Sequence, residues 1–85
     1  MKKIYRLVYE DLTHLGGPMG TEYTTYSHMG TYSAPKTARA EAAKNYARKS
    51  GKVVKALKWY KESPTHFRTD DLLFVMYHIY EDTVE

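Results

Sequence analysis

Histidines are the side chains here best suited to acid–base or metal chemistry, because imidazole titrates near neutral pH and also ligates metals. The chain has four, at His14, His28, His66 and His78. No two share the spacing that places two zinc ligands on one face of a helix. We expect His14 and His66 to lie in surface loops and His78 to be half-buried on an apolar strand. The histidine spacing therefore predicts no metal site.

Carboxylates could supply a general acid and a general base if two of them faced each other across a site. Adjacent pairs occur at the ends of expected strands: Glu10–Asp11, Asp70–Asp71 and Glu81–Asp82. Neighbouring strand residues point to opposite faces, so such a pair does not form an acid–base dyad. Cysteine is absent, which excludes disulfides, thiolate metal ligands and cysteine nucleophiles. We therefore expect a protein that is not an enzyme and uses no cofactor.

Glycines in the segment THLGGPMG, residues 13–20, follow an expected strand, as phosphate-binding glycines do. A second strand is expected after them, whereas a phosphate-binding loop leads into a helix N-terminus. The segment is therefore predicted to be a hairpin loop.

Positive charge is concentrated in residues 34–61, where nine basic residues accompany only Glu41, for a net charge of +8. Residues 69–85 carry five acidic groups and no Lys or Arg, for −5. This pattern indicates either a solvated surface partly neutralised by the acidic C-terminal stretch or a basic surface for an anionic partner. On the second interpretation, the expected partner-binding residues are Lys44, Arg48, Lys49, Lys52, Lys55, Lys58, Trp59 and Tyr60.

Aromatic residues are numerous, with nine tyrosines, two phenylalanines and one tryptophan in 85 residues. Tyrosine combines rigid apolar area with a polar tip, which suits both protein interfaces and the packing of a small sheet. The stretch LKWYKE interleaves aromatic side chains with lysines, as surfaces that stack single-stranded nucleic acid do.

The helical pattern is clearest over residues 35–50, PKTARAEAAKNYARKS. Pro35 suits a first helical turn, and Gly51 follows as a left-handed stop. One arc is apolar and is expected to pack against a sheet: Ala40, Ala42, Ala43, Tyr46 and Ala47. Alanine makes this face thin, so we expect Ala43 and Ala47 to approach the sheet closely.

Alternating apolar and β-branched residues predict four strands, and the segments between them read as loops. The strands are 3–12, 21–32, 52–62 and 71–81, with loops at 13–20 and 63–70. The second strand, rich in Thr and Tyr, is expected near an edge, with Gly30 at a bulge or an early end. The last is apolar on both faces and expected to be central. Its alternative is a helix capped by Thr69.

Together these elements predict a single α+β domain, residues 1–85, with a four-stranded antiparallel sheet and one helix on one face, in the order ββαββ. The second sheet face is left to water, to a partner or to a second copy, and we expect it to be apolar and covered in a homodimer. Its expected residues include some of Tyr5, Tyr9, Tyr23, Trp59 and Tyr77. The charged N-terminus matches neither a signal peptide nor a membrane span, so we expect a cytoplasmic protein without membrane contact.

The MKKIYRLVYED start, the cysteine-free chain, the tyrosine-rich strands and the single helix between hairpins resemble short bacteriophage accessory proteins, including anti-CRISPR and other anti-defence inhibitors. This resemblance implies a small non-catalytic protein that blocks a surface of a larger, host-defence protein complex. The alternative function is a small basic nucleic-acid-binding protein that uses the Lys/Arg-rich segment 36–61.

Overall fold

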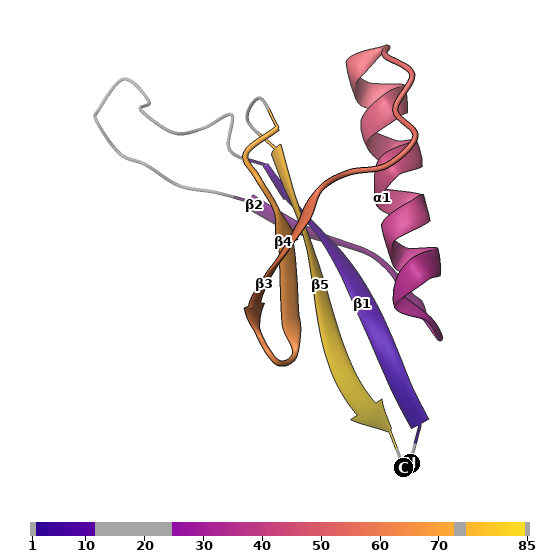
Figure 1. Ribbon diagram of the computed structural model, residues 1–85, viewed down its shortest axis with the longest axis vertical. Helices are drawn as coiled ribbons and strands as arrows, with labels where there is room; N and C mark the ends of the chain where they lie inside the picture. Colours follow the sequence, from indigo (N-terminus) through magenta and orange to yellow (C-terminus); the bar gives the residue numbers. More distant parts are fainter. Residues whose placement is uncertain (1, 12–24, 73–74, 85) are drawn as a thin grey trace, which may run out of the picture.

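The computed structural model of the chain describes residues 2–11, 25–72 and 75–84. One helix covers one face of an antiparallel sheet of five strands, whose order is β2-β1-β5-β4-β3 (Figure 1). The elements in chain order are β1 Lys2–Asp11, β2 Thr25–Tyr32, α1 Pro35–Ser50, β3 Trp59–Ser63, β4 His66–Thr69 and β5 Val75–Val84. The α+β class and the antiparallel sheet are confirmed, whereas the prediction of four strands in the order ββαββ is wrong.

The centre of the sheet is the pairing of β1 with β5, which runs in register from Lys2 opposite Val84 to Asp11 opposite Val75. The sequence of residues 71–81 permits a strand or, as the alternative, a helix. From Val75 onward this stretch belongs to β5, so the strand is confirmed there. The β-branched and aromatic residues of β5 fit a pleated surface that is covered on both faces. The predicted central position of this strand is confirmed.

The edge strand β2 pairs only with β1 in the sheet order, as its Thr- and Tyr-rich sequence predicts. Leu7 pairs with Gly30 and Val8 pairs with His28, so Met29 has no counterpart on β1 and forms a bulge. The bulge lies beside Gly30, where a Cβ atom would come within 2.8 Å of the Tyr32 hydroxyl oxygen. The predicted irregularity at Gly30 is therefore confirmed. The expected loop 13–20 and residues 21–24 lie outside the described residues.

The predicted strand 52–62 is mostly wrong, because residues 52–58 are irregular and β3 begins only at Trp59. The irregular segment runs back along α1 before it crosses to the far edge of the sheet (Figure 1). Its lysines recur at every third residue, a period that matches neither face of a strand. The structure accordingly leaves Val53 95% exposed while Val54 and Leu57 are half-buried.

The predicted loop 63–70 contains the strand that sequence analysis missed. Pro64 and Thr65 form a tight turn, so that Ser63 pairs with His66 and β4 returns beside β3. The Thr65 backbone N–H donates to Ser63 Oγ at 3.3 Å across this turn. A proline near the start of the segment reads as a loop signal, but here it lies in the turn and leaves β4 free to pair.

Helix α1 has the predicted bounds, and its ends follow the expected chemistry. Ala34 is extended, Pro35 lies in the first turn, and Gly51 at φ 70° donates its N–H to the Ala47 carbonyl at 3.0 Å. The face that packs inward is rotated from the predicted arc. Its buried residues are Ala38, Ala42 and Ala43, whereas Ala40 is exposed. Ala47 is partly buried beside Val54 of the irregular segment.

The hydrophobic core lies between α1 and the sheet and consists of Leu7, Ala38, Ala42, Tyr77 and Ile79. Tyr5, Tyr9 and Trp59 pack against this core, so the aromatic side of the sheet is the one that the helix covers. The prediction that these aromatic residues form a free apolar face for a second copy is therefore wrong. Tyr23 lies outside the described residues.

A bilayer-spanning helix is absent from residues 2–11, 25–72 and 75–84, since none there combines the required length with sufficient apolar character.

We predict that Ala42→Leu lowers the free energy of unfolding by about 1–3 kcal/mol, because Ala42 is fully buried and the added methylene and methyl groups must overpack the contact between helix and sheet. Ala40→Leu is the matched control, since Ala40 is exposed on the same helix. Urea unfolding of the two variants measures the difference. Equal midpoints for Ala42→Leu and wild type would contradict this packing.

Candidate functional site

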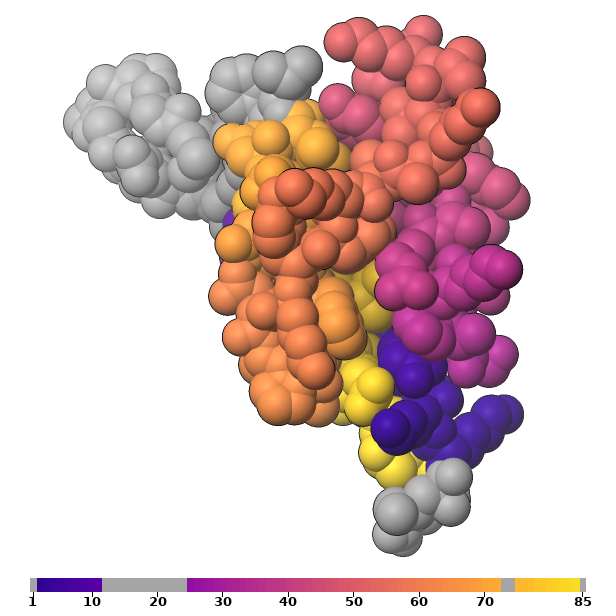
Figure 2. Space-filling model, viewed as in Figure 1, coloured from indigo at the N-terminus to yellow at the C-terminus, as the bar shows by residue number. Residues whose placement is uncertain are grey.

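The basic residues of α1 and of the segment that follows it share one layer of the molecule. Figure 2 shows the helix and this segment together on one side of the molecule, with the hairpin of β3 and β4 on the other. We call this layer the basic surface, and its members are all exposed: Lys36, Arg39, Lys44, Arg48, Lys49, Lys52 and Lys55. The layer arises because residues 52–58 run back along the helix instead of entering the sheet.

Five of the eight predicted partner-binding residues belong to the basic surface, and three do not. Trp59 packs against the core beneath the helix layer. Tyr60, the next residue of β3, donates its hydroxyl to Asp70 Oδ2 at 2.9 Å, and the Arg68 guanidinium lies 5.5 Å from its ring centroid. The Lys58 ammonium group lies 5.4 Å from the same ring. The LKWYKE aromatics are therefore held by contacts within the protein.

Acidic residues of the C-terminal half are engaged on the sheet. Glu81 lies 3.6 Å from the Lys3 ammonium group, and Asp82 lies 2.7 Å from Arg6 Nε. Asp70 contacts Arg68 as well as Tyr60. On the helix, Glu41 lies 3.4 Å from the Lys44 ammonium group. Three of the acidic groups that could have neutralised the basic surface are Asp70, Glu81 and Asp82. They contact cations and a hydroxyl group of the sheet instead. Glu85 lies outside the described residues.

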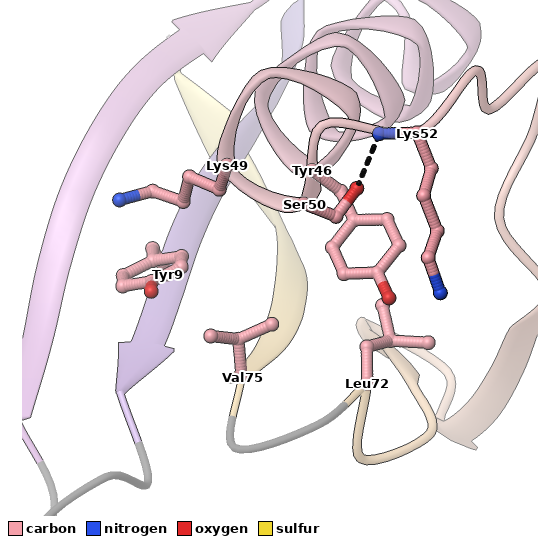
Figure 3. A pocket seen from close by; sticks show the side chains of 7 residues that line it. All are labelled: Tyr9, Tyr46, Lys49, Ser50, Lys52, Leu72 and Val75. Carbon is pink, nitrogen blue, oxygen red and sulfur yellow. Dashed lines mark hydrogen bonds between the residues drawn. The ribbon is translucent and has the colours of Figure 1, made fainter.

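A pocket of about 440 Å³ opens at the C-terminal end of α1 (Figure 3). The lining comes from β1, α1, the start of the irregular segment, the stretch before β5 and β5 itself, with the side chains Tyr9, Tyr46, Lys49, Ser50, Lys52, Leu72 and Val75. The Lys49 ammonium group lies 4.8 Å from the centroid of the Tyr9 ring, within the range of a cation–π interaction. Burial, with a smaller effect from the Asp11 carboxylate, raises the pKa of Tyr9. No sequence spacing indicated this pocket, because its residues meet only when the helix end closes on β1 and β5.

On the opposite face of the sheet, a chain of hydrogen bonds joins Glu10, His78 and His66. Glu10 Oε1 lies 2.6 Å from His78 Nε2, and His78 Nδ1 lies 2.9 Å from His66 Nε2. Glu10 and His78 are 8% and 6% exposed, so this chain is largely shielded from water. The Tyr26 hydroxyl donates to Glu10 Oε2 at 3.1 Å. The chain therefore connects β2, β1, β5 and β4.

Counting donors fixes how protons can be arranged along this chain. A carboxylate only accepts hydrogen bonds, so His78 Nε2–H donates to Glu10. The bond between the two imidazoles then holds one proton, and full protonation of both rings would place two N–H groups face to face. Burial lowers the pKa of His66, and the nearby His78 lowers it further. The Tyr80 ring stacks on His66 with centroids 4.5 Å apart and planes within 10°.

The histidine expectations are thus corrected in two respects. His66 lies on β4 and is half-buried, not in a surface loop. His78 is buried on the sheet face opposite the core, where it contacts Glu10. Diagonal neighbours on paired strands bring these residues together, and that pairing is not visible in sequence spacing. His28 is exposed on β2, and His14 lies outside the described residues.

No group of three His, Asp or Glu side chains is arranged to hold a metal ion within the described part of the chain. Comparisons of the sequence and the structure with protein-family models, curated proteins and solved structures find no match.

We predict that the folded protein loses stability as the pH falls below about 6.5, the ordinary pKa of histidine. The folded state keeps His66 neutral to lower pH than the unfolded chain does, so the unfolded chain binds more protons in this range. The stabilisation is complete above this pH and declines as the pH drops through the lowered pKa. Urea unfolding midpoints measured at several pH values from neutral to mildly acidic would record the decline.

The His66→Phe variant should lose less of its stability on acidification, because it removes the group with the lowered pKa while keeping a ring against Tyr80. The His28→Gln variant is the control and should keep the wild-type profile, since His28 is exposed and its ring contacts the Thr31 hydroxyl, 3.3 Å away, on the same strand. An identical acid profile in wild type and His66→Phe would assign the pH dependence to other groups.

Proposed function

We propose that this chain is a non-catalytic binding protein whose basic surface occupies an acidic patch on a larger protein in the cytoplasm. In this role it would act as an inhibitor of the kind that phage accessory proteins provide, by covering a surface that the larger assembly needs. The observation that carries the proposal is the separation of charge. The basic residues are exposed together on the helix layer, while Asp70, Glu81 and Asp82 are occupied on the sheet.

Electrostatic reasoning supports a partner for such a surface. Clustered like charges repel one another, although exposure and salt screening keep the cost to folding small. The same cluster attracts an anionic surface over distances of about 10 Å and accelerates association. Val53, which is 95% exposed within this layer, adds an apolar point of contact that protein interfaces use.

Nucleic acid is the second candidate partner, because the cations of segment 36–61 suit phosphates equally well. A stacking surface for single strands also needs aromatic faces beside the cations. Trp59 is partly buried against the core and borders a pocket with Lys36, Arg39 and Lys55. Tyr60 is held by contacts with Arg68, Lys58 and Asp70. Both rings of the LKWYKE stretch make contacts within the protein, so we rank the protein partner first and test nucleic acid beside it.

We predict that Arg48→Glu combined with Lys55→Glu leaves the fold intact and abolishes capture of the target by the immobilised protein. Both side chains are exposed on the basic surface, and their reversal makes the surface repel an acidic patch. The matched control is Lys2→Glu with Lys61→Glu, which gives the same change in net charge at exposed lysines of the sheet. Quantitative mass spectrometry of proteins captured from lysate of the producing cells compares the variants, and circular dichroism checks their folds.

Equal capture of the same proteins by both double variants would contradict the proposal. Binding of random-sequence DNA distinguishes the second candidate, measured by fluorescence anisotropy over a salt series. Phosphate contacts on duplex DNA make the logarithm of affinity fall with that of salt, with a slope of about −0.9 per contact. If the wild type binds DNA tightly and the Arg48→Glu/Lys55→Glu variant does not, the partner is nucleic acid and not a protein.

A further inference from the structure

We infer that the pocket at the C-terminal end of α1 is the anchor point of the basic surface and binds an aromatic side chain flanked by carboxylates on the partner. This inference rests on the proposed function and adds to it the chemistry of the segment that is bound. It combines three properties of the pocket: an apolar lining, a pair of exposed cations, and a helix end that disfavours a deeply buried anion.

The lining offers aromatic and aliphatic surface from separate parts of the fold. Tyr9 comes from β1, Tyr46 from α1, Leu72 from the segment before β5, and Val75 from β5 itself. All four are partly buried and pack against the core, so the lining is held in place by the fold. A volume of about 440 Å³ lies within the range of ligand-binding clefts, about 300–1,000 Å³. It is sufficient for one large side chain.

The cations lie at two sides of this space. Lys49 extends over the Tyr9 ring, while Lys52 leaves the chain after the helix end and passes Tyr46 toward Leu72 (Figure 3). Both lysines are exposed, so their ammonium groups border the opening and do not fill the pocket. The Lys52 backbone N–H donates to Ser50 Oγ at 3.3 Å, which ties the start of the irregular segment to the helix end.

The helix end decides where negative charge can lie. The last carbonyl groups of a helix carry partial negative charge, and Gly51 satisfies only the Ala47 carbonyl. A carboxylate deep beside this helix end would be repelled, whereas carboxylates at the opening would contact Lys49 and Lys52. An aromatic or aliphatic group can enter without this penalty. The arrangement therefore fits an aromatic residue with acidic neighbours and disfavours a small inorganic anion.

Such an anchor would complement the rest of the basic surface. Exposed charges mainly set the rate and specificity of association, whereas a large side chain seated in a pocket supplies much of the binding energy. The described basic surface extends from Lys36 to Lys55, and this pocket lies near the C-terminal end of its helix. A partner segment that enters the pocket would thus meet Lys49 and Lys52, the members of the basic surface that line it.

The test uses a short capped peptide with phenylalanine between two pairs of glutamates. One matched peptide replaces phenylalanine by alanine, and another replaces the glutamates by glutamines. Titrations into the isotope-labelled full chain, followed by NMR chemical shifts, give the affinities and the residues affected. We expect the phenylalanine peptide to bind about tenfold more tightly than the alanine peptide. The largest shifts should fall on Tyr9, Tyr46, Leu72 and Val75.

Lys52→Gln should weaken binding of the phenylalanine peptide about two- to fivefold, since it removes one exposed charge beside the pocket and leaves the backbone contact with Ser50 in place. Lys55→Gln is the control, because Lys55 belongs to the basic surface but does not line this pocket. It should leave the ratio between the phenylalanine and alanine peptides unchanged. Both changes are at exposed positions and preserve the fold.

Each other outcome overturns the inference in a defined way. Equal affinity for the phenylalanine and alanine peptides would remove the anchor, and equal affinity for the glutamate and glutamine peptides would remove the role of the lysines. Absence of binding by any peptide would overturn the pocket as a peptide site. None of these results decides the proposed function, which is judged by target capture with the Arg48/Lys55 reversal.

Discussion

The structure depends on the antiparallel pairing of β1 with β5 along their full lengths. Because strand side chains alternate between faces, this one register decides on which side of the sheet each residue lies. Leu7, Tyr77 and Ile79 fall on the side where α1 buries them. Glu10 and His78 fall on the other, where they meet each other. A shift of one residue would turn the apolar side chains of one strand away from the helix and its polar side chains toward it. The core would then lose its packing, and Glu10 and His78 would lose their hydrogen bond.

The same register produces the separation of charge on which the proposed function rests. It aligns Lys3 and Arg6 of β1 with Glu81 and Asp82 of β5, so that the acidic C-terminal strand is balanced on the sheet. The helix lies over the face of the sheet that carries Leu7, Tyr77 and Ile79 and turns its charged residues to solvent. The helix layer therefore carries an excess of positive charge, because Glu81 and Asp82 form their ion pairs on the sheet.

The sheet face that the helix does not cover is held together by polar contacts. The hairpin of β3 and β4 reaches the central strands through a short ladder, in which His66 to Arg68 pair with residues 78–80. The imidazole bond between His66 and His78 reinforces that ladder, and Glu10 links it to β1. Buried polar groups are costly unless all are satisfied, and no buried side-chain N or O atom of the described residues lacks a hydrogen-bond partner. The sheet is therefore bound together by its polar face as well as by its core.

The amino-acid sequence alone determined the helix, because Pro35, the alanine pattern and Gly51 act within a few residues of one another. It also determined the α+β class, the edge position of β2 and the central position of β5, which follow from local composition. Tertiary structure decided which arc of the helix is buried, that residues 52–58 stay outside the sheet, and that His66 lies on an additional strand, β4. It also formed the pocket and the Glu10–His78–His66 chain. Those features depend on strand register and on contacts between distant segments, which no local spacing encodes.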